Sequence, residues 1–96
     1  MVKQSLKTQF GIINYYYSDG LLIFLGSFIN KEYRGQGKWK EMVNTLFKMF
    51  PKGTKVQVPV TKKFLVDFFE SKGFKKVEKI EYWGKPINTI NFEGII

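Results

Sequence analysis

INKEYRGQGKWKEMVNTLF, residues 29–47, leads from an apolar segment through a glycine-bearing polar loop into an amphipathic segment, and this junction decides the fold. Before it, Leu21–Ile29 is apolar on both faces, as in a central strand that is covered on each side. After it, Lys38–Met49 predicts a helix, because apolar residues recur at helical spacing. The apolar positions are Trp39, Met42, Val43, Leu46 and Phe50.

The segment upstream of the junction predicts a hairpin. Phe10–Tyr17 is rich in β-branched and aromatic residues and predicts a strand, and the turn signal Asp19-Gly20 joins it to the next one. The first eight residues are polar, and we expect them to fray or to begin an edge strand.

The segment downstream predicts a strand and a second helix. Lys55–Val60 carries valines at period two, and Pro59 lacks an N–H, so we expect pairing to fail on one side near the end of this strand. Thr61 is the expected N-cap of a helix that runs to about Lys72, with Gly73 after its end. The side chains expected to point inward are Phe64, Leu65, Phe68 and Phe69.

Lys76–Trp83 and Ile87–Phe92 predict two closing strands, joined by a turn at Gly84-Lys85-Pro86. The expected order is β-β-α-β-α-β-β, which gives one α/β domain over residues 1–96 with a mixed sheet and two packing helices. The strand–helix–strand order in the middle implies a parallel, right-handed crossover.

Composition narrows the function. Sixteen Lys and Arg against eight Asp and Glu give a net charge of +8, which attracts nucleic acid, acidic protein surfaces or phosphorylated cofactors and also serves solubility. The chain has no Cys and no His. Disulfides, thiolate metal sites and imidazole catalysis are therefore excluded, and we expect no metal site. No signal-peptide pattern is present and the longest apolar stretch, Leu21–Leu25, cannot span a membrane, so we expect a cytoplasmic protein.

The loop of the junction favours anion binding. Glycine lets a backbone approach a ligand closely, and a helix N-terminus offers unpaired N–H groups to a phosphate or diphosphate. Arg34, Lys38 and Lys40 add positive charge. Neither the Walker pattern nor the full dinucleotide fingerprint is present. Alternatively, Gly35 and Gly37 only form a tight turn.

Two segments carry a resemblance to a known family. INKEYRGQGKWKEMVNTLF resembles the signature of the GNAT superfamily of acyl-CoA N-acyltransferases, with Arg34 and Gly37 at fixed positions of its Arg/Gln-x-x-Gly-x-Gly/Ala motif. FLVDFFESKGFKKVE, residues 64–78, resembles the family's second hallmark, and Gly73 and Phe74 match its end. The length of 96 residues leaves no room for the family's N-terminal strand and helices, so we expect a reduced GNAT-like core with an open acceptor site.

The resemblance implies a cofactor, acetyl-CoA, and a set of residues that hold it. Backbone amides of the loop would hold the diphosphate, and the pantetheine arm would pair with backbone near Phe28 and Ile29, in a gap between the strands that end at Ile29 and Val60. Lys62, where many members have Asn, would still reach a phosphate. The loop residues implied are Arg34, Gly35, Gln36, Gly37, Lys38 and Trp39.

Several positions depart from the family pattern. Trp39 replaces Gly or Ala, and its side chain either turns into the core, leaving the amide free, or crowds the diphosphate. Phe69 replaces a tyrosine that protonates the leaving thiolate, and phenylalanine has no proton to give. The family's frequent glutamate base is absent as well. Catalysis would then depend on proximity and on backbone polarisation of the thioester. Candidate proton relays are Ser27, Tyr33 and Tyr82.

Three functions are compatible with these residues. The first is acetyl transfer from acetyl-CoA to an amine, with a protein or another macromolecule as acceptor. The second is a catalytically weak GNAT-like module that binds a partner. The third is a nucleic-acid binder that uses basic side chains near aromatic ones, for which the chain offers no recognised motif.

Overall fold

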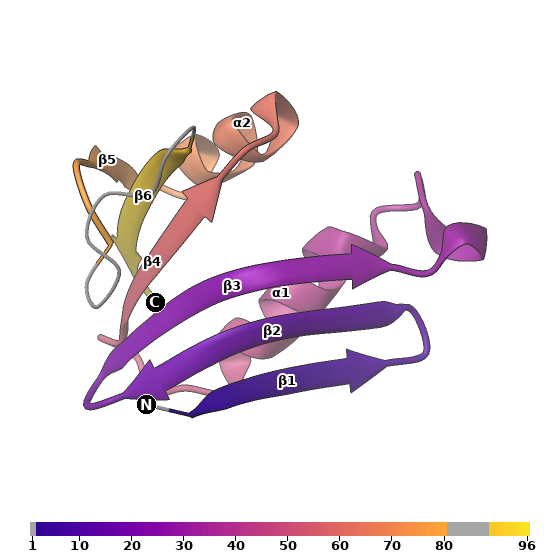
Figure 1. The fold of residues 1–96 in the computed structure, drawn as a ribbon, viewed down its shortest axis with the longest axis horizontal. Helices are drawn as coiled ribbons and strands as arrows, with labels where there is room; N and C mark the ends of the chain where they lie inside the picture. The colour runs from indigo at the N-terminus through magenta and orange to yellow at the C-terminus, as the bar shows by residue number, and fades with distance from the viewer. Residues whose placement is uncertain (1, 81–88) are drawn as a thin grey trace.

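The computed structural model describes residues 2–80 and 89–96. Within these ranges the chain forms a six-stranded mixed sheet of order β1-β2-β3-β4-β6-β5 and two α-helices (Figure 1). The strands are β1 (Lys3–Thr8), β2 (Gly11–Ser18), β3 (Leu21–Ile29), β4 (Lys55–Val60), β5 (Lys75–Val77) and β6 (Ile90–Ile95). The helices are α1 (Lys38–Lys48), α2 (Lys63–Ser71) and the short 3₁₀ turn η1 (Lys31–Tyr33). The α/β class, the mixed sheet and its two helices are confirmed.

The structure has one strand more than the expected order at its start, the edge strand β1. It pairs antiparallel with β2 from Lys3↔Tyr16 to Thr8↔Gly11, so the polar first residues begin an edge strand. Its exposed lysines, Lys3 and Lys7, hinder addition of a further strand at this edge.

The start of α2 differs from the prediction. Its N-cap is Lys62, whose φ of −108° and ψ of 133° keep the backbone extended, and no side chain caps the helix. Thr61 therefore lies one residue too early to reach the first amides, and its prediction as N-cap is wrong. Phe64 is 63% exposed instead of inward. It lies in the first turn of α2 at the border of the stripe formed by Leu65, Phe68 and Phe69, since each residue advances about 100° around a helix.

The C-terminal strands are also displaced from their expected positions. Lys75–Val77 is only three residues long, and β6 runs from Ile90 to Ile95 rather than ending at Phe92. The rest of the predicted strand to Trp83 and the turn at residues 84–86 lie outside the described residues. No helix in the described part of the chain is long and apolar enough to cross a membrane.

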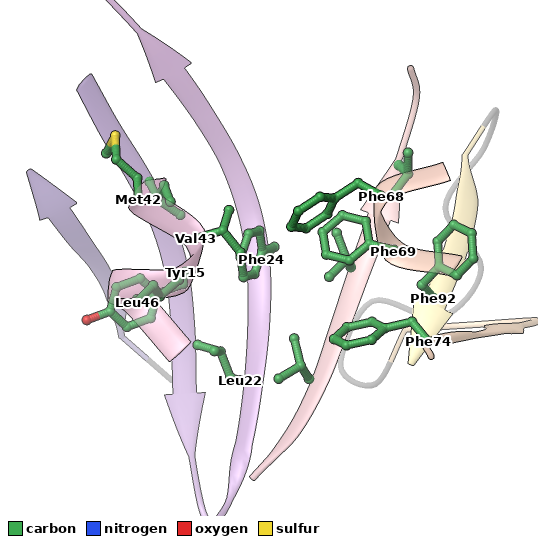
Figure 2. Packing of buried hydrophobic residues seen from close by; sticks show 14 residues of the cluster. Tyr15, Leu22, Phe24, Met42, Val43, Leu46, Phe68, Phe69, Phe74 and Phe92 are labelled. Atoms are coloured by element: carbon green, nitrogen blue, oxygen red, sulfur yellow. The ribbon is translucent and has the colours of Figure 1, made fainter. Parts of the chain in front are cut away.

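The main core lies between one face of the sheet and both helices. Leu22 and Phe24 of β3 and the valines of β4 meet Met42, Val43 and Leu46 of α1 and Phe68 and Phe69 of α2 in a single cluster (Figure 2). A smaller cluster of Leu21, Ile23 and Ile80 lies apart from it. Both helices therefore cover the same face of the sheet, and α1 forms the crossover between the parallel strands β3 and β4.

The two central strands separate after a short contact. β3 pairs with β4 only from Leu21↔Lys55 to Ile23↔Gln57, and beyond these residues the strands diverge (Figure 1). Asn14 pairs with Gly26 and Tyr15 with Phe24, so Leu25 is the extra residue of a β-bulge, which bends a strand. On the other strand, β4, Pro59 has no N–H to donate on the side that faces β3. The predicted one-sided loss of pairing is confirmed, because the same part of β4 still pairs with β6.

Candidate functional site at the gap between two strands

A cleft of about 790 Å³ opens where β3 and β4 separate. The second half of β3, the loop before α1 and the first turn of α1 form one side. The end of β4 and the first turn of α2 form the other. Ring contacts fill its base, where Phe69 lies 5.9 Å from Trp39 and 6.2 Å from Phe24 between ring centroids. The junction singled out by the sequence therefore forms one wall and the mouth of this cleft.

Unpaired backbone amides gather at the start of α1. Gly37 is its N-cap in a left-handed conformation, with φ of 74° and ψ of 12°, and no side chain caps the helix. Along the described chain, residues 34–37 form turns, but none of the N–H groups of residues 35–40 makes a hydrogen bond of good geometry to a described residue. Glu41 is the first residue whose amide makes one, to the Gly37 carbonyl at 3.2 Å. A left-handed residue followed by a right-handed one points successive N–H groups into one concavity, which suits an anion.

The glycines of this loop leave open space beside the amides. Gly35 also has a positive φ, of 78°, and a Cβ built on either glycine would meet no atom within 4 Å. The tight turn and the free amides are therefore both present, so the two alternatives for this loop are not exclusive. A diphosphate fits this loop, because donors and room occur together. We call residues 35–40 the amide cradle.

Arg34 and Gln36 differ from what the resemblance implies. The Arg34 amide donates to the Lys31 carbonyl at 3.4 Å, so it is not available to a ligand and the cradle begins at Gly35. The Arg34 side chain donates through Nε to the Ile29 carbonyl at 2.9 Å, and its guanidinium lies 5.0 Å from the ring centre of Phe28. The Gln36 side chain donates to the Glu32 carbonyl at 2.9 Å, so Gln36 offers its amide alone.

Cations surround the cleft. Its described lining includes Arg34, Lys38, Lys40 and Lys62 and contains no carboxylate. The Lys38 ammonium group already makes two contacts, because Nζ lies 3.4 Å from the Glu41 carboxylate and 4.6 Å from the ring centre of Phe10. A positive field over a concave wall attracts phosphates and accelerates their association.

The edge of β3 presents alternate backbone groups to the cleft. The Asn30 amide donates to the Phe10 carbonyl at 2.8 Å, on the β2 side, so the groups of Ile29 point to the opposite edge, where Arg34 meets its carbonyl. By the same alternation, Ser27 faces the cleft and Phe28 faces β2. Of Phe28 and Ile29, therefore, only Ile29 turns its backbone groups to the cleft, and pairing of the pantetheine arm near these two residues stays a prediction. Phe28 is 55% exposed and is one of the residues that line the cleft.

The Trp39 indole lines the cleft wall, while the Trp39 amide belongs to the amide cradle. Its indole packs edge-on against Phe68 and Phe69, at centroid distances of 5.0 and 5.9 Å. Its Nε1 donates to the Ser27 hydroxyl at 2.8 Å. Of the two alternatives for Trp39, the first is confirmed, because the ring turns toward the core and the amide stays free.

The other predicted proton carriers occupy different places. Tyr33 lines the cleft near its mouth and makes an edge-on contact with Phe10 at 4.9 Å. Tyr82 lies outside the described residues. Phe69 is fully buried and lines the cleft, so this position brings a ring without a hydroxyl. Sequence reasoning did not name Phe64 and Thr89 as lining residues, and the one available signal was that Phe64 lies four residues after the end of a proline-bearing strand at Val60.

Known structures share this architecture. No protein-family model and no curated protein matches the chain. A GNAT-family acetyltransferase from Staphylococcus aureus Mu50 matches 90% of the chain at 13% identity with a TM-score of 0.63. A candidate acetyltransferase from Agrobacterium tumefaciens matches 99% of it at 16% identity with a TM-score of 0.61, the chain spanning 74% of that protein. A domain from Methanocaldococcus jannaschii matches 96% at 18% identity with a TM-score of 0.54, over 63% of its own length.

These identities show the fold alone. The chain has a GNAT-like fold, and it spans 59% of the length of the Staphylococcus protein.

Proposed function

Starting from this GNAT-like fold, we propose that the chain binds acetyl-CoA and transfers the acetyl group to an amine. The observation that carries the proposal is the amide cradle at the mouth of the cleft, where unpaired N–H groups meet a cationic wall. Glycine conformations, helix start and strand separation all converge on this one place. We treat residues 1–96 as one domain with this function, and the cytoplasmic location stays a prediction from the sequence.

The chain's own groups divide the work of binding. The amide cradle takes the diphosphate, with Lys38, Lys40 and Lys62 as neighbouring cations. The cleft-facing groups of Ser27 and Ile29 pair with the extended arm as a neighbouring strand would. Arg34 already occupies the Ile29 carbonyl, so the arm either uses the amide of Ile29 or displaces this side chain.

We assign the catalytic contribution to backbone groups on the β3 side of the same cleft. Acetyl-CoA supplies an acetyl group activated as a thioester. The Ser27 amide points into the cleft, where an N–H placed in advance stabilises negative charge that develops on a carbonyl oxygen. Fixing the reacting groups in one orientation lowers the barrier further. The acceptor we propose is an amine on a protein or another macromolecule, since the mouth of the cleft carries exposed side chains such as Phe28 and Phe64.

A second function is favoured by one observation. Phe69 is buried and has no hydroxyl, so the family's proton donor is missing from its usual place. The alternative is a catalytically weak module that works by binding a protein or nucleic acid through its basic surface. Measured acetyl transfer to an amine separates the two functions.

Calorimetry with two thioesters tests the binding proposal. Acetyl-CoA and acetylpantetheine share the arm and the acetyl group, but only acetyl-CoA carries the diphosphate. If the amide cradle binds the diphosphate, acetylpantetheine binds at least tenfold more weakly, and only the affinity for acetyl-CoA falls steeply with salt. Equal affinities at every salt concentration would remove the cradle as the binding site. Acyl transfer to a peptide amine, followed by mass spectrometry, then establishes the reaction.

A further inference from the structure

The side chains of Ser27 and Trp39 form a hydrogen-bonded pair inside the cleft, whereas the binding proposal uses only the backbone groups of these residues. The Trp39 Nε1–H donates to Ser27 Oγ at 2.8 Å, and both residues line the cleft. The pair joins β3 to α1 across the wall where the Ser27 amide also points. It lies next to Phe69, whose ring is 5.9 Å from that of Trp39.

The indole determines what the Ser27 hydroxyl can still do. A hydroxyl has one proton to donate and two lone pairs that accept. An indole N–H only donates, so one lone pair of Ser27 is taken by Trp39. One donor and one acceptor position remain, and in the described chain no other partner fills them. The hydroxyl can therefore receive one proton while it gives another.

The position of the indole is fixed by its own packing. Its ring makes edge-on contacts with Phe68 and Phe69, at interplanar angles of 76° and 89°. Such edge-on aromatic contacts stabilise the ring beyond the burial of its surface area. Trp39 thus packs against Phe68 and Phe69 of α2 and donates its indole hydrogen bond to Ser27. The N–H also stabilises negative charge on the serine oxygen, which makes the hydroxyl a better proton donor.

We propose that Ser27 relays the proton of the acceptor amine to the departing sulfur and that Trp39 is its positioning residue. This inference rests on the proposed acetyl transfer. As the N–C bond forms and the C–S bond breaks, Ser27 Oγ accepts a proton from the nitrogen and gives its own proton to the sulfur. Serine ends as it began, one proton has moved from nitrogen to sulfur, and no external base is consumed.

The relay through Ser27 would do the work of the tyrosine hydroxyl that is missing at Phe69. A serine alone is a much weaker acid than a thiol, so it cannot protonate a thiolate without recovering a proton at the same time. Simultaneous recovery from the amine removes this difficulty. Tyr33, the other described hydroxyl proposed from the sequence, lies near the mouth against Phe10.

Three variants test the relay with steady-state kinetics. Ser27→Ala removes the hydroxyl, and we expect kcat to fall about a hundredfold, at the lower end of what general acid–base catalysis contributes. Trp39→Phe keeps an aromatic ring against Phe68 and Phe69 but removes the N–H, and we expect kcat to fall about fivefold, the equivalent of one hydrogen bond worth about 1 kcal/mol. KM for acetyl-CoA stays within twofold in both. Ser27→Thr keeps a hydroxyl and restores most of the lost rate.

The double variant decides whether the pair acts as one unit. Groups that act through each other are not additive, so Ser27→Ala with Trp39→Phe should be no slower than Ser27→Ala alone. Thr45→Val is the matched control, because it removes a hydroxyl hydrogen bond to the Glu41 carbonyl on the exposed side of α1 and leaves kcat unchanged. Thermal unfolding of each variant shows that it is folded.

These experiments distinguish failure of the relay from failure of the proposed acetyl transfer. An unchanged kcat in Ser27→Ala, or an additive loss in the double variant, overturns the relay and leaves acetyl transfer standing. A wild-type chain that binds acetyl-CoA without acetylating any amine overturns both the relay and the proposed reaction.

Discussion

The amide cradle predicts a charge-dependent effect at Gly37, which can be isolated with two isosteric variants. Gly37 has a φ of 74°, so most side chains would be strained there, but Asn and Asp tolerate this conformation best. A Cβ at Gly37 meets no atom within 4 Å, so neither variant clashes with the chain. Gly37→Asn and Gly37→Asp therefore share the same backbone cost, and they differ by one negative charge beside the unpaired amides.

The size of the difference follows from Coulomb's law. Two unit charges about 4 Å apart interact by about 1 kcal/mol in water and about 4 kcal/mol at an effective dielectric constant near 20. The loop is exposed, so a repulsion of about 1.4–2.8 kcal/mol is expected, which makes acetyl-CoA binding about 10–100-fold weaker in Gly37→Asp than in Gly37→Asn.

Calorimetric titration with acetyl-CoA measures this difference. We expect it to shrink as salt is raised from about 0.05 to 0.5 M, because the charges are screened. The two variants should unfold at similar temperatures, which shows that the change lies in binding. The same Kd in both variants at low salt would refute the assignment of the diphosphate to this loop.

Two further predictions concern the core and one close contact. Leu46→Ala should lower the free energy of unfolding by about 2–5 kcal/mol, because Leu46 is fully buried in the main cluster, and a denaturant titration with an unchanged slope would confirm it. Gly94→Ala should cost about 1–3 kcal/mol, because the new Cβ would lie 2.3 Å from the Phe74 ring and force it to move. Gly20→Asn, where a Cβ meets nothing and φ is 80°, is the control, and an equal loss in the two glycine variants would contradict the close-contact explanation.

Local patterns predicted the elements that depend on local chemistry. β3 and β4 have the predicted bounds, and α1 begins at Lys38 directly after a left-handed glycine. The helix stripe with Met42, Val43 and Leu46 is buried as its spacing indicates. These features follow from periodicity and turn chemistry, which the sequence carries in full.

The orientation of the site depends on sheet register, which a single sequence does not carry. The bulge at Leu25 decides that Ser27, and not Phe28, turns its backbone to the cleft. A shift of one residue exchanges every backbone group along an edge. The exposure of Phe64 similarly depends on the residue at which α2 begins. Because the backbone of Lys62 is extended, the helix begins only at Lys63. The hydrogen bond from Trp39 to Ser27 joins residues twelve apart and could not be anticipated from either one.

Two of the departures from the GNAT pattern, Trp39 and Phe69, lie in contact with each other in the structure. Trp39 and Phe69 stand where the family has a small residue and a tyrosine, and their rings lie in contact at 5.9 Å. A tyrosine at residue 69 would bring a hydroxyl to a fully buried position, where a polar group without a partner costs about 1–3 kcal/mol. An indole at residue 39 packs against the phenylalanine and turns its N–H outward to Ser27. The N–H that this side of the cleft offers to Ser27 therefore comes from Trp39 of α1 and not from residue 69 of α2.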